Sequence, residues 1–106
     1  MSLKIVRRDI TTLEVDAIVN AANVRLAVGG EENLLRNCYT NSLKLTVEKN
    51  LQSIAFPLIS SGIYGYPPVD ALKTAVAAIE DFLKNNDLKV VFTVMNQKLI
   101  DNFLSN

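Results

Sequence analysis

Histidine and tryptophan are absent from this 106-residue sequence, and cysteine occurs only once, as Cys38. A single cysteine allows no internal disulfide, and a structural zinc site would lack the histidine and cysteine ligands that such sites use. We therefore expect no metal site. We expect no cofactor either. Cys38 lies in the apolar row of a predicted helix, where a cysteine is usually an inert core residue.

The sequence also lacks a charge excess and a long apolar run. Its 11 lysines and arginines balance 11 aspartates and glutamates, and without a basic cluster it has no electrostatic footprint for duplex nucleic acid. No apolar stretch approaches the ~20 residues that a membrane-spanning helix needs. The opening residues, Met1–Lys4, do not resemble a signal peptide. We expect a cytoplasmic protein whose partners include neither a membrane nor duplex nucleic acid.

Apolar side chains make up 49% of the sequence, enough for one small core in a single domain over residues 1–106. Apolar runs alternate with segments of helical periodicity. We predict strands at 3–8, 16–22, 53–60 and 89–95, and helices at 31–49, 68–84 and 97–104. The first strand is predicted at a sheet edge, Pro57 predicts a local irregularity, and Asn96 is a plausible N-cap. The alternation predicts an α/β fold with a largely parallel sheet, helices on both faces and ligands at the carboxyl ends of the strands.

The turn after the third predicted strand, residues 60–67, is a candidate phosphate site. Gly62 and Gly65 allow a close approach of the backbone, so that successive N–H groups and the following helix could converge on an anion. Ser60 and Ser61 could add hydroxyl donors. The alternative is an ordinary strand-to-helix loop in which the glycines serve the turn.

Polar residues at two other predicted strand ends are further candidates. Asn20 and Asn23 follow a buried strand and could bond sugar hydroxyls, or they could only hold the turn in place. Asp9 follows the first strand, where its carboxylate could accept from an exocyclic amine or could simply be a solvated turn residue.

Four segments carry a resemblance to a known family. They are Arg8–Thr11, Val15–Asn23, Ile54–Pro57 and Ser60–Pro67, and in this order they resemble the macro domain family. The resemblance implies a three-layer α/β/α sandwich that binds ADP-ribose. Many members also remove ADP-ribose from proteins or deacetylate O-acetyl-ADP-ribose, and no metal is implied.

The resemblance also implies roles for individual residues. Asp9 would accept from the adenine amino group beside the backbone of Ile10, and Asn23 would hold the distal ribose. Met95 stands where the family often has an aromatic residue that stacks on adenine, and Asn96 where it often has an acid. The predicted ligand-binding residues are Asp9, Ile10, Asn20, Asn23, Ser60, Ser61, Gly62, Ile63, Tyr64 and Met95.

The chain departs from the family pattern between its two matching parts. In the family the asparagine turn leads into a glycine-rich loop, a helix and two more strands, whereas here Gly30 is followed directly by Glu31. The expected result is a shortened sandwich, reduced to a roughly four-stranded, mostly parallel sheet with three helices. The strand at 16–22 would then be an exposed edge, which favours a homo-oligomer.

From these observations we predict a macro-like domain with a partial ADP-ribose site. We expect weak binding of ADP-ribose or a related nucleotide and no catalysis, because the family's central acid is absent and the chain has no histidine to act as a general base. One alternative is a ligand-free engineered or minimised α/β scaffold. Another is an ADP-ribosyl hydrolase or deacetylase, if the central segment belongs to the protein after all.

Overall fold

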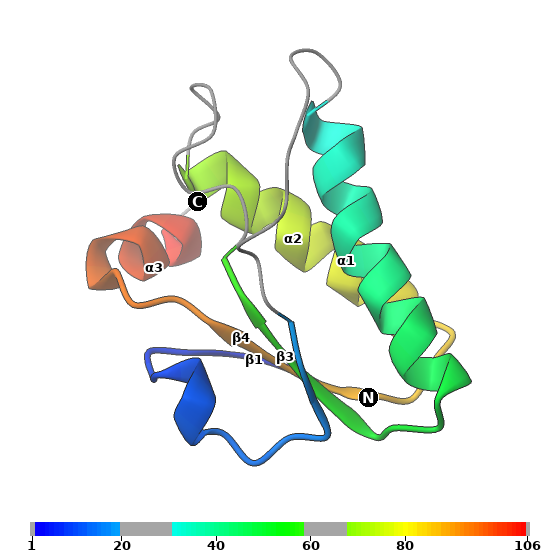
Figure 1. Ribbon diagram of the computed structural model, residues 1–106. Helices are drawn as coiled ribbons and strands as arrows, with labels where there is room; N and C mark the ends of the chain where they lie inside the picture. Colours follow the sequence, from blue (N-terminus) through cyan, green and yellow to red (C-terminus); the bar gives the residue numbers. More distant parts are fainter. Residues whose placement is uncertain (1, 20–30, 59–67, 106) are drawn as a thin grey trace.

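The computed structural model describes residues 2–19, 31–58 and 68–105 (Figure 1). This part of the chain forms β1 (Ser2–Val6), the 3₁₀ helix η1 (Ile10–Thr12), β2 (Ala17–Ile18), α1 (Glu31–Glu48), β3 (Ser53–Pro57), α2 (Pro68–Leu83), β4 (Lys89–Thr93) and α3 (Gln97–Leu104). The four strands pair in parallel in the order β1-β4-β3-β2. The predicted α/β fold of four parallel strands and three helices is confirmed.

The strands end earlier than the sequence predicted. β1 ends at Val6, β4 at Thr93 and β3 at Pro57, and these residues lie side by side in the register, Val6 opposite Thr93 and Thr93 opposite Pro57. Pro57 has no N–H to extend the ladder, so the predicted irregularity coincides with the end of β3. The three strands therefore stop at one common level.

The helix boundaries follow from local capping. Asn96 caps α3, its side-chain oxygen accepting from Leu99 N at 3.3 Å, as the sequence predicted. α1 ends in a Schellman motif, in which Leu51 N donates to Thr46 O and Asn50 N donates to Val47 O. Asn50 supplies the required left-handed conformation, with φ of 60°.

All three helices pack on one face of the sheet (Figure 1). Tyr39 of α1 is fully buried, with its ring centroid 5.1 Å from that of Phe56 and 5.8 Å from that of Phe92. Leu99 of α3 joins the same core, and Cys38 packs against it, where burial raises the pKa of its thiol. This core ties all three helices to β3 and β4.

The sequence predicted helices on both faces, and the described residues differ from that expectation. The connections β2–α1–β3 and β3–α2–β4 step in the same direction across the sheet, and crossovers of one hand then place their helices on the same face. On the opposite face, Val91 is nonetheless buried, and it lines a hollow together with Leu13 and Val15 from the segment before β2. In the described residues the third layer therefore consists of this segment and the short 3₁₀ helix η1, and it contains no α-helix.

β2 is the short strand at the other edge of the sheet. Asp16 precedes it, accepting from Gln52 N at 2.8 Å and donating its own N–H to Ser53 Oγ at 2.8 Å. Ile18 lies on the face away from the helices and is 49% exposed. The predicted edge is therefore observed, while association through it stays a prediction. None of the described helices is long and apolar enough to cross a membrane.

We expect two leucines of α1 to respond very differently to truncation. Leu43 is fully buried in the core, whereas Leu45, two residues further on, is 51% exposed. Leu43→Ala should lower the free energy of unfolding by about 2–5 kcal/mol, and Leu45→Ala by no more than about 0.5 kcal/mol. Urea denaturation followed by circular dichroism measures both, and equal losses would contradict the one-sided packing of α1.

Candidate functional site

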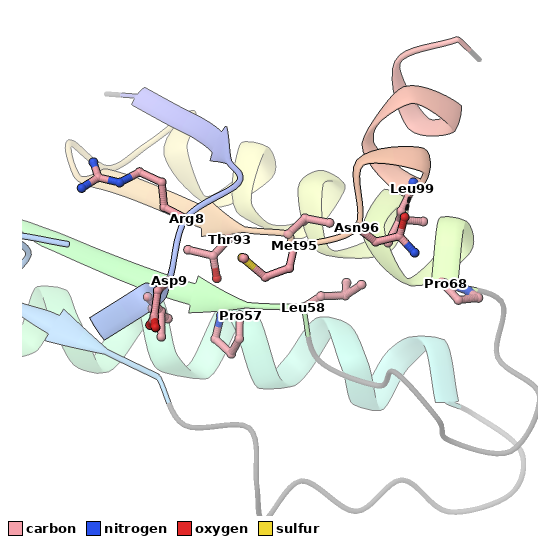
Figure 2. A pocket seen from close by; sticks show the side chains of 11 residues that line it. Arg8, Asp9, Pro57, Leu58, Pro68, Thr93, Met95, Asn96 and Leu99 are labelled. Atoms are coloured by element: carbon pink, nitrogen blue, oxygen red, sulfur yellow. Dashed lines mark hydrogen bonds between the residues drawn. The ribbon is translucent and has the colours of Figure 1, made fainter. Parts of the chain in front are cut away.

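A cavity of about 540 Å³ opens at the level where β1, β3 and β4 end (Figure 2). This is the position at which open parallel sheets bind ligands. Most of its lining is apolar, with a few polar groups around it. The lining residues are Arg8, Asp9, Ile10, Pro57, Leu58, Pro68, Thr93, Val94, Met95, Asn96 and Leu99.

The carboxylate of Asp9 is held in one orientation by Thr11. Asp9 is the N-cap of η1, and its Oδ1 accepts from Thr11 N at 2.9 Å and from Thr11 Oγ1 at 2.7 Å. Both bonds lower the pKa of Asp9 from its usual value, and the bond from the backbone N–H of Thr11 has the larger effect. Among the described residues no bond is found to Oδ2. Asp9 is therefore a fixed, ionised acceptor with one oxygen available at the cavity.

Two hydrogen bonds connect the walls of the cavity that follow β1 and β4. Arg7 Nε donates to the carbonyl oxygen of Met95 at 3.0 Å, and Val94 N donates to Val6 O at 2.9 Å. They fix the backbone on both sides of the opening, although residues 7 and 95 are far apart in the sequence. The Met95 side chain is 60% exposed and lies between Asp9 and Leu58 in Figure 2.

The third wall follows β3 and is apolar. Pro57 and Leu58 line it, and Thr93 is tied to it by a bond from Oγ1 to Phe56 O of 3.2 Å. Met95 faces this wall across the cavity (Figure 2). The thioether of Met95 and the apolar β3 wall both offer contacts that suit a flat, apolar ring.

Two helices begin at the rim of the cavity. Pro68 is the first residue of α2, and Asn96 is the N-cap of α3. Helix N-termini carry partial positive charge, so both favour a negatively charged group. Asp70 in the first turn of α2 offsets part of this field, whereas the first turn of α3 has no acid. The site thus combines an apolar cleft, one carboxylate acceptor and a rim suited to an anion.

Three of the predicted site residues, Asp9, Ile10 and Met95, come together in this cavity. The other predicted ligand-binding residues lie outside the described residues; they are Asn20, Asn23, Ser60, Ser61, Gly62, Ile63 and Tyr64. Sequence reasoning did not name Leu58, Thr93, Asn96 and Leu99 as site residues. For Leu58, Thr93 and Asn96, a position just before or after a predicted strand end was the available signal, because the carboxyl ends of parallel strands meet at one edge. Leu99 lies within the predicted helix 97–104, and the strand ends give no signal for it.

Within residues 2–19, 31–58 and 68–105, no three cysteine, aspartate or glutamate side chains lie close enough to hold a metal ion together. Asp9 is also the one acid among the described residues that line the cavity.

This chain is a parallel α/β domain with a cleft at its strand ends, an architecture that many protein families share. Comparisons with known proteins identify the family. The family model of the macro domain matches residues 11–75, more than half of the chain. The chain belongs to the macro domain family.

Two relatives show how the chain compares with longer members. The macro domain-containing protein CT2219 of Chlorobaculum tepidum is 30% identical over 154 residues, covering 91% of this chain and 90% of its own length. The matched stretch is longer than this chain, so that protein carries residues within it that have no counterpart here. The mouse ADP-ribose glycohydrolase MACROD2 is 34% identical over 79% of this chain, which spans only 30% of that enzyme.

Solved structures support the same fold. A macrodomain from Trypanosoma brucei in complex with ADP-ribose matches 97% of this chain and 68% of its own with a TM-score of 0.81, at 23% identity. A mutant macrodomain from Oceanobacillus iheyensis, solved with ADPR, is 37% identical, with a TM-score of 0.65 over 80% of this chain and 45% of its own.

We expect the contribution of Asp9 to stability to depend on pH. Because its pKa is lowered in the folded state, the ionised carboxylate stabilises the fold above the ordinary aspartate pKa of 3.8. That contribution is lost as the pH falls through the lowered folded-state value. Asp9→Ala should therefore reduce the free energy of unfolding at pH 7, and the deficit should shrink as the pH approaches 2.

Urea denaturation of wild type and Asp9→Ala at a series of pH values measures this difference. Glu14→Ala, which removes an exposed carboxylate that does not bond Thr11, controls for the lost charge. A deficit for Asp9→Ala that is constant from pH 7 to pH 2 would contradict the role of the Thr11 bonds.

Proposed function

We propose that this chain binds ADP-ribose weakly, with the adenosine end in the cavity at the strand ends, and does not turn it over. The observation that carries the proposal is that Asp9, Ile10 and Met95 line one cavity in a member of the macro domain family. The relatives solved with ADP-ribose or named for acting on it support the choice of ligand.

The cavity offers adenine both a polar and an apolar contact. Oδ2 of Asp9 would accept from the exocyclic amino group, while Thr11 keeps Oδ1 occupied and the carboxylate oriented. The faces of the base would lie against Met95 on one side and Pro57 and Leu58 on the other. Met95 has no aromatic face, so it gives adenine dispersion contacts but no stacking.

The diphosphate would extend toward the start of α2. Residues 59–67 join Leu58 to Pro68, and both of these residues line the cavity. The predicted phosphate-binding residues Ser60–Tyr64 belong to this connection, and Asn20 and Asn23 are proposed for the ribose hydroxyls. The positive end of α2 would add attraction for the phosphates.

The absence of turnover follows from the available acid–base groups. An efficient general base has a pKa near the working pH, whereas the pKa of Asp9 is lowered by its bonds to Thr11. The sequence contains no histidine. A carboxylate that is already held by two donors is a suitable acceptor for a ligand and a poor base for activating water.

We expect Asp9 to distinguish the amino group of adenine from a carbonyl. Wild type should bind ADP-ribose at least about tenfold more tightly than its inosine analogue, in which a carbonyl replaces the amino group, because charge-assisted bonds are the strong ones. Asp9→Ala should lose this preference. Titrations followed by ¹H–¹⁵N NMR measure both affinities, even when they are weaker than micromolar.

Glu14→Ala is the matched control, since it removes the same charge outside the cavity. Equal affinity of wild type for the two ligands would show that Asp9 does not read the base. No saturable shifts with either ligand would instead support a ligand-free scaffold, and a thermal midpoint that ADP-ribose fails to raise would agree with it.

Hydrolysis is the second candidate, favoured by the similarity to an ADP-ribose glycohydrolase. We expect incubation of ADP-ribosylated protein with this chain to release no more ADP-ribose than the buffer does. Release that Asn23→Ala abolishes would overturn this expectation, because that asparagine is proposed to hold the distal ribose. Release that survives the substitution would point to a contaminating enzyme.

A further inference from the structure

Three cationic side chains lie on the sheet face that the described α-helices do not cover. A hollow of about 380 Å³ lies there between β1, β4 and the segment that follows η1. Lys4, Arg8 and Lys89 line it, together with a single acid, Glu14. Val6 and Val91 also line the hollow. This volume is within the range of small-ligand sites, about 300–1,000 Å³.

The strand register brings two of these cations together. Lys4 pairs with Val91 and Ser2 pairs with Lys89, so the two lysines are diagonal neighbours on one face. Strand geometry puts their Cα atoms about 8 Å apart. Both side chains leave the same face of the sheet from this backbone spacing, so the two ammonium groups can approach one anion together.

The positive charges of the hollow are not fully neutralised within the described part of the chain. Neither lysine nor Arg8 forms a salt bridge with another described residue, and all three are exposed. Glu14 balances one of the three charges at most. An anion carrying several charges would relieve the repulsion and meet donors from three separate segments.

We propose that this hollow is a second binding site, for a small anion that carries two or more phosphate groups. The lysines would act as point charges toward phosphate oxygens, and Arg8 could bind two oxygens at once. The site does not depend on the ADP-ribose proposal, because Lys4 and Lys89 do not line the cavity at the strand ends. Arg8 lines both, and in Figure 2 its side chain extends away from Met95 and Leu58.

The test is an NMR titration of the whole chain with tripolyphosphate at constant ionic strength. Saturable shifts should centre on the amides of Lys4, Val6, Thr12 and Lys89. The double variant Lys4→Gln/Lys89→Gln should weaken binding at least about tenfold, because it removes both point charges. Lys73→Gln/Lys98→Gln removes the same charge from exposed positions on α2 and α3 and should change the affinity less than twofold.

Several outcomes would overturn the proposal. These are an absence of saturable shifts in wild type, equal weakening in the two double variants, and equal binding of citrate, which carries its charge on carboxylates. Circular dichroism of both variants shows whether they fold. If Lys4→Gln/Lys89→Gln does not fold, the location of the wild-type shifts tests the proposal. Shifts centred on residues away from the hollow would reject the site.

Discussion

The common end level of three parallel strands is the constraint on which the rest of this structure depends. Val6, Thr93 and Pro57 stand in register, and each strand stops there. The parallel pairing fixes this level through β4, which bonds β1 on one side and β3 on the other. Because the segments that follow β1, β3 and β4 leave the sheet at the same level, one cavity lies between them and each segment forms one of its walls. The ends of the strands and the site are thus the same feature of the fold.

The cavity is held in shape by bonds that link segments far apart in the sequence. Arg7 reaches the carbonyl of Met95, and Thr93 bonds the carbonyl of Phe56, so every wall is fastened to a neighbour. Asp9 is oriented separately by Thr11. This preorganisation reduces the ordering cost of binding. It also explains how an exposed carboxylate can present one defined acceptor, with its pKa lowered by the same bonds.

Much of the fold could be predicted from local pattern, since apolar periodicity and capping residues act over a few neighbours. The helix 97–104 and its cap Asn96 were predicted correctly, and α1 ends where Asn50 can take a left-handed conformation. The predicted strands extend beyond the observed ones at their carboxyl ends. An apolar residue such as Val94 or Leu58 can either continue a strand or line a cavity, and residue type alone does not distinguish these positions. The prediction of helices on both faces of the sheet was wrong for the described residues. Periodicity shows that a helix has an apolar side, but it does not show which face of the sheet that side packs on.

By itself the sequence determined the fold class and the family, and it named Asp9, Ile10 and Met95, which line one cavity, because these inferences depend on residue types in a fixed order. Only the tertiary structure decided that all three described helices share one face and that Lys4 and Lys89 stand together on the other. These facts depend on strand order and register. Both are set by packing between segments that are distant along the chain, and no local pattern contains them.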